Sequence, residues 1–150
     1  LSDLKNKGWQ LIVVGEGAGK QHYQKMAEKL SIHAFVSWVG LVSDLRAWYT
    51  GTGLYVLPSR YEGTPNSLYE ALSYGAPVIC SESLVKVHPV IDIEKPWVTF
   101  ENESVQDLCG KLRHLCSDED FRRSLAMDGR RYVGALGSIS GVSEWEELLN

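Results

Sequence analysis

Short apolar runs alternate with amphipathic stretches along most of this chain. The apolar runs are short and bounded by glycine or proline, as buried strands of a parallel sheet usually are. Strands are expected over 11–14, 35–39, 54–57, 77–80 and 97–100. Because stretches with helical spacing separate these runs, the pattern predicts an α/β fold in which helices cover both faces of a parallel sheet.

Periodic apolar positions predict the helices. Their apolar residues are Tyr23, Met26, Ala27 and Leu30; Leu45, Trp48 and Tyr49; Val105, Leu108, Cys109, Leu112, Leu115 and Cys116; and Phe121, Leu125 and Tyr132. Ser43 is the expected cap of the second of these helices, and Gly75 is the expected stop of another that follows the loop at Ser59. Residues 84–96 show no regular pattern. A closing helix is expected over 143–149, after a link loosened by Gly134, Gly137 and Gly141.

Size and composition fit one domain over residues 1–150. The net charge of −4 comes from interleaved charges of both signs without a basic stripe, so we expect no nucleic acid partner. The three cysteines have no Cys-x-x-Cys spacing, which predicts a reducing compartment and neither a disulfide framework nor a zinc ribbon. No apolar stretch reaches the roughly 18 residues that span a bilayer, so we expect a soluble chain.

Two glutamates, Glu62 and Glu70, stand eight positions apart after the strand expected over 54–57. One lies in the loop beyond that strand and the other in the helix that follows. In open α/β sheets the ligand crevice lies outside the carboxyl ends of the strands. We therefore expect both carboxylates to face a bound molecule.

Four segments, taken in order, also carry a family resemblance: 11–17, 35–40, 57–63 and 70–79. Together they resemble the carboxyl-terminal, donor-binding domain of retaining GT-B glycosyltransferases of the family 4 type, which carry two glutamates separated by seven residues. The resemblance covers roughly residues 5–132 and implies a Rossmann-like half of a two-domain enzyme. It further implies transfer of a hexose from a nucleotide-sugar to a glycan or glycolipid, with retention of anomeric configuration.

The resemblance assigns a role to each glutamate. Glu62 would be the catalytic carboxylate, which binds the donor sugar and stabilises positive charge at its anomeric carbon; the alternative is a solvated loop acid. Glu70 would bind the ribose hydroxyls of the nucleotide, because a carboxylate accepts two hydrogen bonds from a vicinal diol. The segment 67–70 also has the form of a capping box, in which Glu70 would bind the backbone N–H of Ser67 instead.

Backbone N–H groups at the start of that helix would bind the donor phosphates, aided by the positive end of the helix dipole. By resemblance these groups belong to Gly63, Thr64, Asn66, Ser67 and Leu68. Pro65 stands where the family more often has glycine and has no N–H, so the side-chain amide of Asn66 would replace the lost donor. Arg60 would either meet a phosphate or remain a solvated loop residue.

The first expected turn contains Gly15 and Gly17, which would let the backbone approach the donor, since glycine has no Cβ. The segment of Val39, Gly40 and Leu41 resembles the one that packs against the nucleotide base in this family. An ordinary strand end is the alternative for this segment.

Other ligand classes lack their motifs. A dinucleotide fingerprint requires glycine where Lys20 stands, and a P-loop requires Ser or Thr where Gln21 stands. The four histidines neither cluster with acids nor form a His-Glu-x-x-His motif. The sequence therefore predicts no cofactor and no metal, and the nucleotide-sugar would be a substrate.

By resemblance, a basic pair that clamps the diphosphate and the whole acceptor-binding domain precede the matched region. We therefore expect a chain truncated at its amino-terminal side, whose partners are the nucleotide-sugar and the missing amino-terminal acceptor domain, and which has no transferase turnover alone. The expected location is cytoplasmic, with peripheral membrane association of the full-length protein. Two alternatives stay open: a nucleotide-sugar epimerase of GT-B architecture, and a non-catalytic nucleotide-binding or assembly module.

Overall fold

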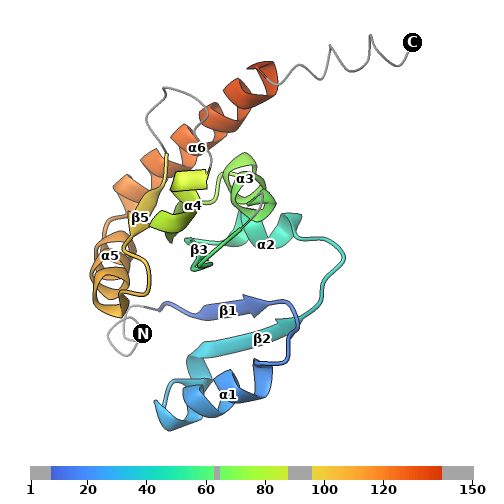
Figure 1. Ribbon diagram of the computed structural model, residues 1–150, viewed down its shortest axis with the longest axis vertical. Coiled ribbons are helices and arrows are strands. Elements are labelled where there is room, and N and C mark those ends of the chain that lie inside the picture. The colour runs from blue at the N-terminus through green and yellow to red at the C-terminus, as the bar shows by residue number, and fades with distance from the viewer. Residues whose placement is uncertain (1–7, 63–64, 88–95, 140–150) are drawn as a thin grey trace. The chain divides into compact units, whose positions relative to one another are not determined.

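The computed structural model describes residues 8–62, 65–87 and 96–139. The chain forms two compact units that are contiguous in sequence, Leu1–Leu45 and Arg46–Asn150. Parallel strands and helices make up both units (Figure 1). Whether the units fold as the single domain expected from the sequence stays a prediction.

The first unit contains β1 (Leu11–Val14), α1 (Lys20–Lys29), the short 3-10 helix η2 (His33–Phe35) and β2 (Val36–Gly40). β1 and β2 pair in parallel, with Leu11 opposite Val36. The register shifts after Val13, so that Val14 lies opposite Gly40. Both strands expected in this part of the sequence are therefore confirmed.

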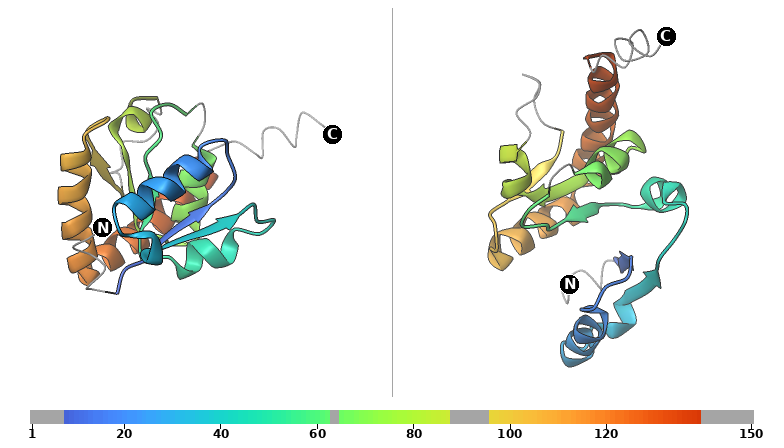
Figure 2. Two further views of the ribbon diagram at one scale, coloured as in Figure 1. Left: turned by 90° about the horizontal axis from the view of Figure 1, so that it is seen from below. Right: turned by 45° about the vertical axis from the view of Figure 1, so that its right-hand side comes forward.

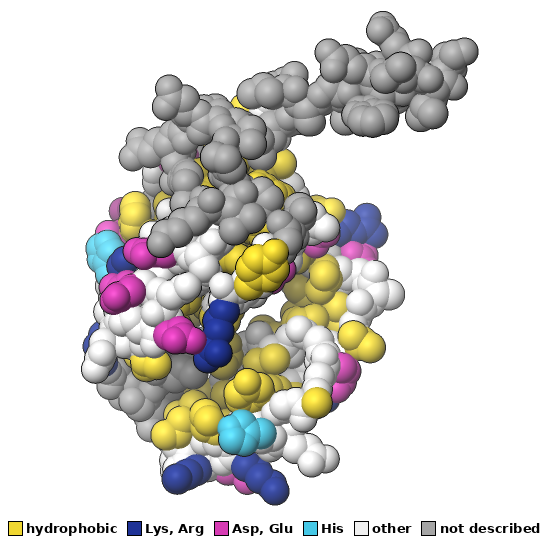
Figure 3. All heavy atoms as spheres, viewed as in Figure 1, with side chains coloured by type: hydrophobic (Ala, Val, Ile, Leu, Met, Phe, Trp, Pro, Cys, Tyr) yellow, Lys and Arg dark blue, Asp and Glu magenta, His cyan; other side chains and the backbone are white. Residues whose placement is uncertain are grey.

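Helix α1 has the expected position but not the expected burial. Of the apolar residues that define its stripe, Ala27 is buried, whereas Tyr23, Met26 and Leu30 are exposed. Hydrophobic side chains accordingly lie at the surface around α1 in Figure 3. Periodicity located the helix but not its buried residues, because a two-stranded pair offers a helix little apolar surface to cover.

The second unit begins with α2 and contains a three-stranded parallel sheet in the order β3-β4-β5. Its elements are α2 (Arg46–Gly51), β3 (Tyr55–Leu57), α3 (Asn66–Ser73), β4 (Val78–Ser81), α4 (Glu82–Val87), β5 (Val98–Phe100), α5 (Val105–Ser117) and α6 (Glu119–Ile139). Val56, Ile79 and Val98 lie in register across the sheet. The expected α/β class, with parallel strands and helices on both faces, is confirmed (Figure 2).

Strand β4 is the centre of this unit, and all of its residues are buried. Ile79 belongs to a core cluster with Phe100, Leu115 and Leu125, which come from β5, α5 and α6. This burial explains the apolar run of the sequence, because a central strand with both faces covered has no polar alternation.

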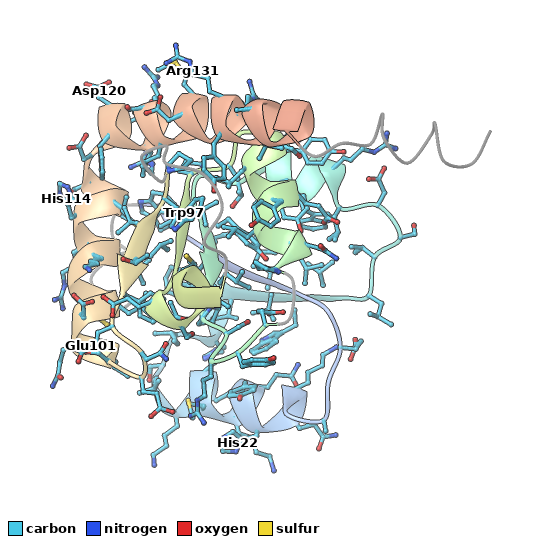
Figure 4. All side chains as sticks on the ribbon, turned by 45° about the horizontal axis from the view of Figure 1, so that its top comes forward. His22, Trp97, Glu101, His114, Asp120 and Arg131 are labelled. Atoms are coloured by element: carbon cyan, nitrogen blue, oxygen red, sulfur yellow. The ribbon has the colours of Figure 1, made fainter. Side chains whose placement is uncertain are left out.

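Helix α3 packs directly against α6. A Cβ atom added at Gly129 would lie 2.8 Å from Cδ2 of Leu72, so glycine lets the two helices approach closely. Farther along α6, Tyr132 is buried and meets the ring of Trp97 edge to face at a centroid distance of 5.2 Å. Trp97 lies beside α6 in Figure 4. Close helix packing thus holds α3 to α6, and the aromatic pair holds α6 to the residue before β5.

Several local expectations were wrong. Helix α2 begins at Arg46, so Ser43 is too far upstream to be its cap. Helix α4 occupies part of the stretch that showed no pattern, since six residues are too few to display a period. Val105, expected in the apolar stripe of α5, is exposed. Helix α6 continues through both Gly134 and Gly137, because each glycine in a helix costs only about 1 kcal/mol relative to alanine.

The expected closing helix over 143–149 and Gly141 lie outside the described residues.

Replacing Gly75 with alanine tests the turn that ends α3. Gly75 has a φ of +74°, and its N–H and that of Ala76 donate to the carbonyls of Leu72 and Ala71, both at 2.9 Å. A Cβ here would also lie 2.6 Å from Cζ of Arg130. We expect Gly75→Ala to lower the free energy of unfolding by about 1–2 kcal/mol in urea titrations.

The control for this variant is Gly110→Ala, in the interior of α5, where an added Cβ has nothing within 4 Å. This change should leave stability unchanged or raise it by about 0.5–1 kcal/mol, since alanine is the better helix former. Equal effects of the two substitutions would contradict the assignment of Gly75 as a left-handed helix stop.

Alkaline titration tests the burial of Tyr132. Burial, and next the neighbouring Tyr69, raise the pKa of this phenol above its ordinary value of 10.0. The unfolded chain therefore ionises first, so stability is full below about pH 10 and falls as the pH rises above it, by at most about 1.4 kcal/mol per pH unit for this group. Tyr132→Phe removes that slope, so the free energies of unfolding of the two proteins should converge between pH 9 and 11. A constant difference would contradict the raised pKa.

Candidate functional site

Glu62 lies in the loop beyond the carboxyl end of β3 and is half-buried. The hydroxyl of Ser59 donates a hydrogen bond to its Oε1 at 2.7 Å. A hydrogen bond to a carboxylate fixes the direction of the side chain. Glu62 is therefore a held carboxylate and not a freely rotating surface acid.

The loop that carries Glu62 is in turn tied to the end of β4. The backbone carbonyl of Ser59 accepts hydrogen bonds from the hydroxyls of Ser81 at 2.6 Å and Ser83 at 3.2 Å. The Ser81 and Ser83 hydroxyls also lie 2.7 Å apart, and Ser81 is almost fully buried. Because parallel strands end at the same edge of a sheet, the end of β4 can support the loop after β3.

Glu70 projects from α3 and is exposed. Its Oε2 accepts a hydrogen bond at 3.1 Å from the hydroxyl of Tyr49, which comes from α2. The capping-box alternative was wrong: α3 begins at Asn66, its cap position is Pro65, and no side chain bonds the cap. A capping box needs its glutamate three residues after the cap, whereas Glu70 lies five residues after it.

The phenol of Tyr55 connects the surroundings of the two glutamates. Burial raises its pKa above the ordinary value, the hydrogen bonds to Ser67 and Tyr49 lower it, and the charges of Glu62 and Glu70 raise it. Burial likewise raises the pKa of Tyr49, with contributions from Tyr55 and Glu70. The charges of both carboxylates thus act on the pKa of one phenol, which belongs to β3.

The loop between the glutamates is described only in part, because Gly63 and Thr64 lie outside the described residues. Asn66 and Ser67 occupy the first two positions of α3, where N–H groups have no acceptor within the helix. The N–H of Leu68 donates to the carbonyl of Pro65 at 2.9 Å, so it already has a partner. Asn66 and Ser67 are therefore the better placed of these donors.

In the first unit, the expected donor-binding residues come together at one edge. The N–H of Gly15 donates to the carbonyl of Gly40 at 2.8 Å, which joins the turn after β1 to the end of β2. Gly15 and Gly40 both have positive φ values, of 126° and 84°. A Cβ at Gly40 would lie 2.9 Å from Oε1 of Glu16, so this carboxylate covers the glycine.

The remaining members of this edge are open. Leu41 is exposed, and a Cβ at Gly17 would meet nothing within 4 Å. Glu16, which covers Gly40, is paired with Lys20 at 2.7 Å. The glycine turn and the segment from Val39 to Leu41 thus form one continuous edge of the first unit.

The structure also places Arg60 and the other charged side chains of the surface. Arg60 forms an ion pair with Glu103 at 2.9 Å, and both side chains are well exposed. Acidic and basic side chains are interspersed on the face seen in Figure 3.

Within the described residues, no group of three or more His, Cys, Asp and Glu is arranged to hold a metal. His114 projects outward from α5 in Figure 4. Among the helices that the structure describes, none combines the length and apolar character that crossing a membrane requires.

Sequence reasoning missed Ser59, Ser81 and Ser83, and it treated Tyr49 only as a packing residue. A signal for two of these serines was available in the sequence. Ser59 directly follows Pro58 at the end of one apolar run, and Ser81 follows the run at 77–80, so both stand where a strand is expected to end. No signal could reveal the contact of Tyr49 with Glu70, because the two residues are 21 positions apart on different helices.

Comparison with known families gives a match over residues 1–132 to the model described as glycosyl transferases group 1. Among curated proteins, the amylovoran biosynthesis glycosyltransferase AmsD of Erwinia amylovora is 24% identical over 148 residues, which cover 99% of this chain and 42% of that protein. The chain spans less than half the length of the curated relatives that it matches.

Two solved structures share the fold. A mutant of S. aureus TarM in complex with Fondaparinux, alpha-GlcNAc-glycerol and UDP is 24% identical, with a TM-score of 0.81 over 97% of this chain and 29% of that one. The C-terminal domain of the glycosyl transferase group 1 family protein LpcC from Francisella tularensis is 23% identical, with a TM-score of 0.77 over 88% of this chain and 72% of that one. Because the family match spans most of its length, this chain belongs to the glycosyl transferases group 1 family.

Proposed function

We propose that this chain is the donor-binding domain of a retaining, family 4 type glycosyltransferase, which transfers a hexose from a nucleotide-sugar to a glycan or glycolipid. The observation that carries the proposal is the position of Glu62, which Ser59 holds in the loop at the carboxyl edge of the sheet, with Glu70 on the helix that follows. Ligands of open α/β sheets bind at this edge. Two acids held there by different partners suit two different parts of one ligand.

Glu70 is suited to the ribose of the nucleotide. It is exposed, and its carboxylate accepts a hydrogen bond from the hydroxyl of Tyr49 through Oε2. A carboxylate offers about four lone-pair sites, so it can accept both hydroxyls of a vicinal diol in addition to the Tyr49 bond. The start of α3 lies one turn away, where Asn66 and Ser67 present N–H groups suited to a diphosphate.

Glu62 is suited to the sugar. Its half-buried carboxylate, oriented by Ser59, would bind hydroxyls of the hexose and stabilise positive charge at the anomeric carbon as the bond to the leaving phosphate breaks. In the front-face displacement proposed here, a leaving-group oxygen accepts the proton of the acceptor hydroxyl. The new bond then forms on the face that the leaving group has left, so the configuration is retained.

The compared proteins support the proposed donor, the class of product and the place of this domain in the whole protein. TarM was solved with UDP, and AmsD is named for amylovoran biosynthesis, which favours a nucleotide-sugar donor and a polysaccharide or glycolipid product. LpcC matches through its C-terminal domain, which favours the same placement for this chain, after an acceptor-binding domain. The proposed location is the cytoplasm, at the membrane face where such products are assembled.

A binding screen tests the donor. We expect saturation-transfer NMR with the chain and UDP, GDP and ADP sugars to show contact with one nucleotide, strongest at its ribose and base protons. Absence of binding for all three nucleotides would contradict the donor-binding role. Interconversion of the bound sugar without an acceptor would indicate an epimerase instead.

Substitution of Glu62 tests the chemistry in the protein that carries this chain with its acceptor domain. Glu62→Gln keeps the shape and the Ser59 contact but removes the charge, so we expect kcat to fall by about 10²- to 10³-fold while the donor Kd changes little. The control is Glu28→Gln on the exposed side of α1, which should leave kcat unchanged.

A kcat of Glu62→Gln within twofold of the original would refute the catalytic role and favour a non-catalytic module. Multiple turnovers by the isolated 150-residue chain would refute the need for an acceptor domain.

A further inference from the structure

The contact between Tyr49 and Glu70 joins a buried group to an exposed one. Tyr49 is 5% exposed, whereas Glu70 projects from the surface of α3, and the hydroxyl reaches Oε2 at 3.1 Å. An exposed glutamate on a helix normally samples several rotamers, and this freedom is lost when it binds a ligand. The buried phenol restrains Glu70 before any ligand arrives.

Packing on two sides fixes the direction of the Tyr49 hydroxyl. Its ring meets the ring of Tyr55 edge to face, with centroids 5.5 Å apart, and lies parallel to the ring of Tyr74 at 6.0 Å. Tyr55 belongs to β3 and Tyr74 to the end of α3, so both contacts come from elements that frame the site. The phenol cannot turn away from Glu70 without breaking them.

The protonation states also suit a fixed donor and acceptor. Burial, together with Tyr55 and Glu70, holds the pKa of the Tyr49 phenol above its ordinary value. The phenol is therefore neutral at physiological pH and donates a hydrogen bond to the carboxylate. The arrangement is a neutral donor aimed at a charged acceptor, which is a stronger pair than two neutral groups.

We propose that Tyr49 is a positioning residue, which holds Glu70 in the rotamer that accepts the ribose diol of the nucleotide. The proposal rests on the proposed function, because it needs Glu70 to bind ribose. Tyr49 occupies one lone-pair site of Oε2, and the sites that remain on the two oxygens can accept two ligand hydroxyls. By ordering the carboxylate beforehand, Tyr49 lowers the conformational cost of binding.

The test replaces Tyr49 with phenylalanine, which keeps both ring contacts and removes only the hydroxyl. Calorimetry gives the Kd of the full chain for UDP, GDP and ADP, and for the 2′,3′-dideoxy form of whichever binds most tightly. We expect Tyr49→Phe to weaken binding of the ribose form by about 3- to 10-fold, which corresponds to one ordered side chain. Binding of the dideoxy form should stay within twofold.

The matched control is Tyr74→Phe, which removes the hydroxyl of the stacked neighbour and leaves the Tyr49 bond in place. It should bind both nucleotide forms as the original chain does. A loss of affinity in Tyr74→Phe equal to that in Tyr49→Phe would show an effect of packing alone and overturn the proposal.

A double-mutant cycle shows whether Tyr49 acts through Glu70. In a Glu70→Ala background, Tyr49→Phe should have no further effect on the Kd, because the carboxylate that it positions is gone. Additive effects would overturn the proposal, even if Tyr49→Phe also lowers the melting temperature.

The two proposals fail in different ways. If the original chain binds the ribose and dideoxy forms equally, or binds neither, then the ribose role of Glu70 in the proposed function is wrong. If the original chain prefers ribose and Tyr49→Phe keeps that full preference, then the donor site stands and the positioning role of Tyr49 is wrong.

Discussion

The burial of β4 between β3 and β5 is the constraint on which the second unit depends. All residues of β4 are covered, and its parallel partners fix where each neighbouring strand ends. Parallel strands deliver their carboxyl ends to one edge, so the loop after β3 and the residues after β4 must meet there. The held position of Glu62 follows from this meeting, since Ser81 at the end of β4 binds the backbone of Ser59.

Hydroxyl groups, and not basic side chains, position both glutamates, and there is a physical reason for this. A lysine or arginine beside Glu62 or Glu70 would neutralise the charge that a sugar or ribose hydroxyl must find. Serine and tyrosine hydroxyls instead orient a carboxylate and leave its negative charge and most of its lone pairs available. The contacts of Ser59 with Glu62 and of Tyr49 with Glu70 both have this form.

Helix α3 holds Glu70 in a fixed position because the opposite face of the helix packs against α6. Leu72 packs against Gly129 of α6, and Arg130 of the same helix donates to the carbonyl of Tyr74 at 3.0 Å, where α3 ends. A glycine at position 75 permits the left-handed turn and leaves space for that arginine. The packing of α3 on α6 therefore supports the site on the opposite side of the helix.

The sequence by itself determined the strands, the α/β class, the stop at Gly75 and the likeness to a family, because these depend on local periodicity, on glycine backbone freedom and on motif order. It did not determine which apolar residues are buried, as the exposed Tyr23 and Val105 show. Nor did it reveal the partners of the acids. The bonds of Ser81 to Ser59 and of Tyr49 to Glu70 join residues 22 and 21 positions apart. Only the packing of strands and helices decides such contacts, because a hydrogen bond between distant residues needs its two atoms within about 3 Å and no local spacing sets that distance.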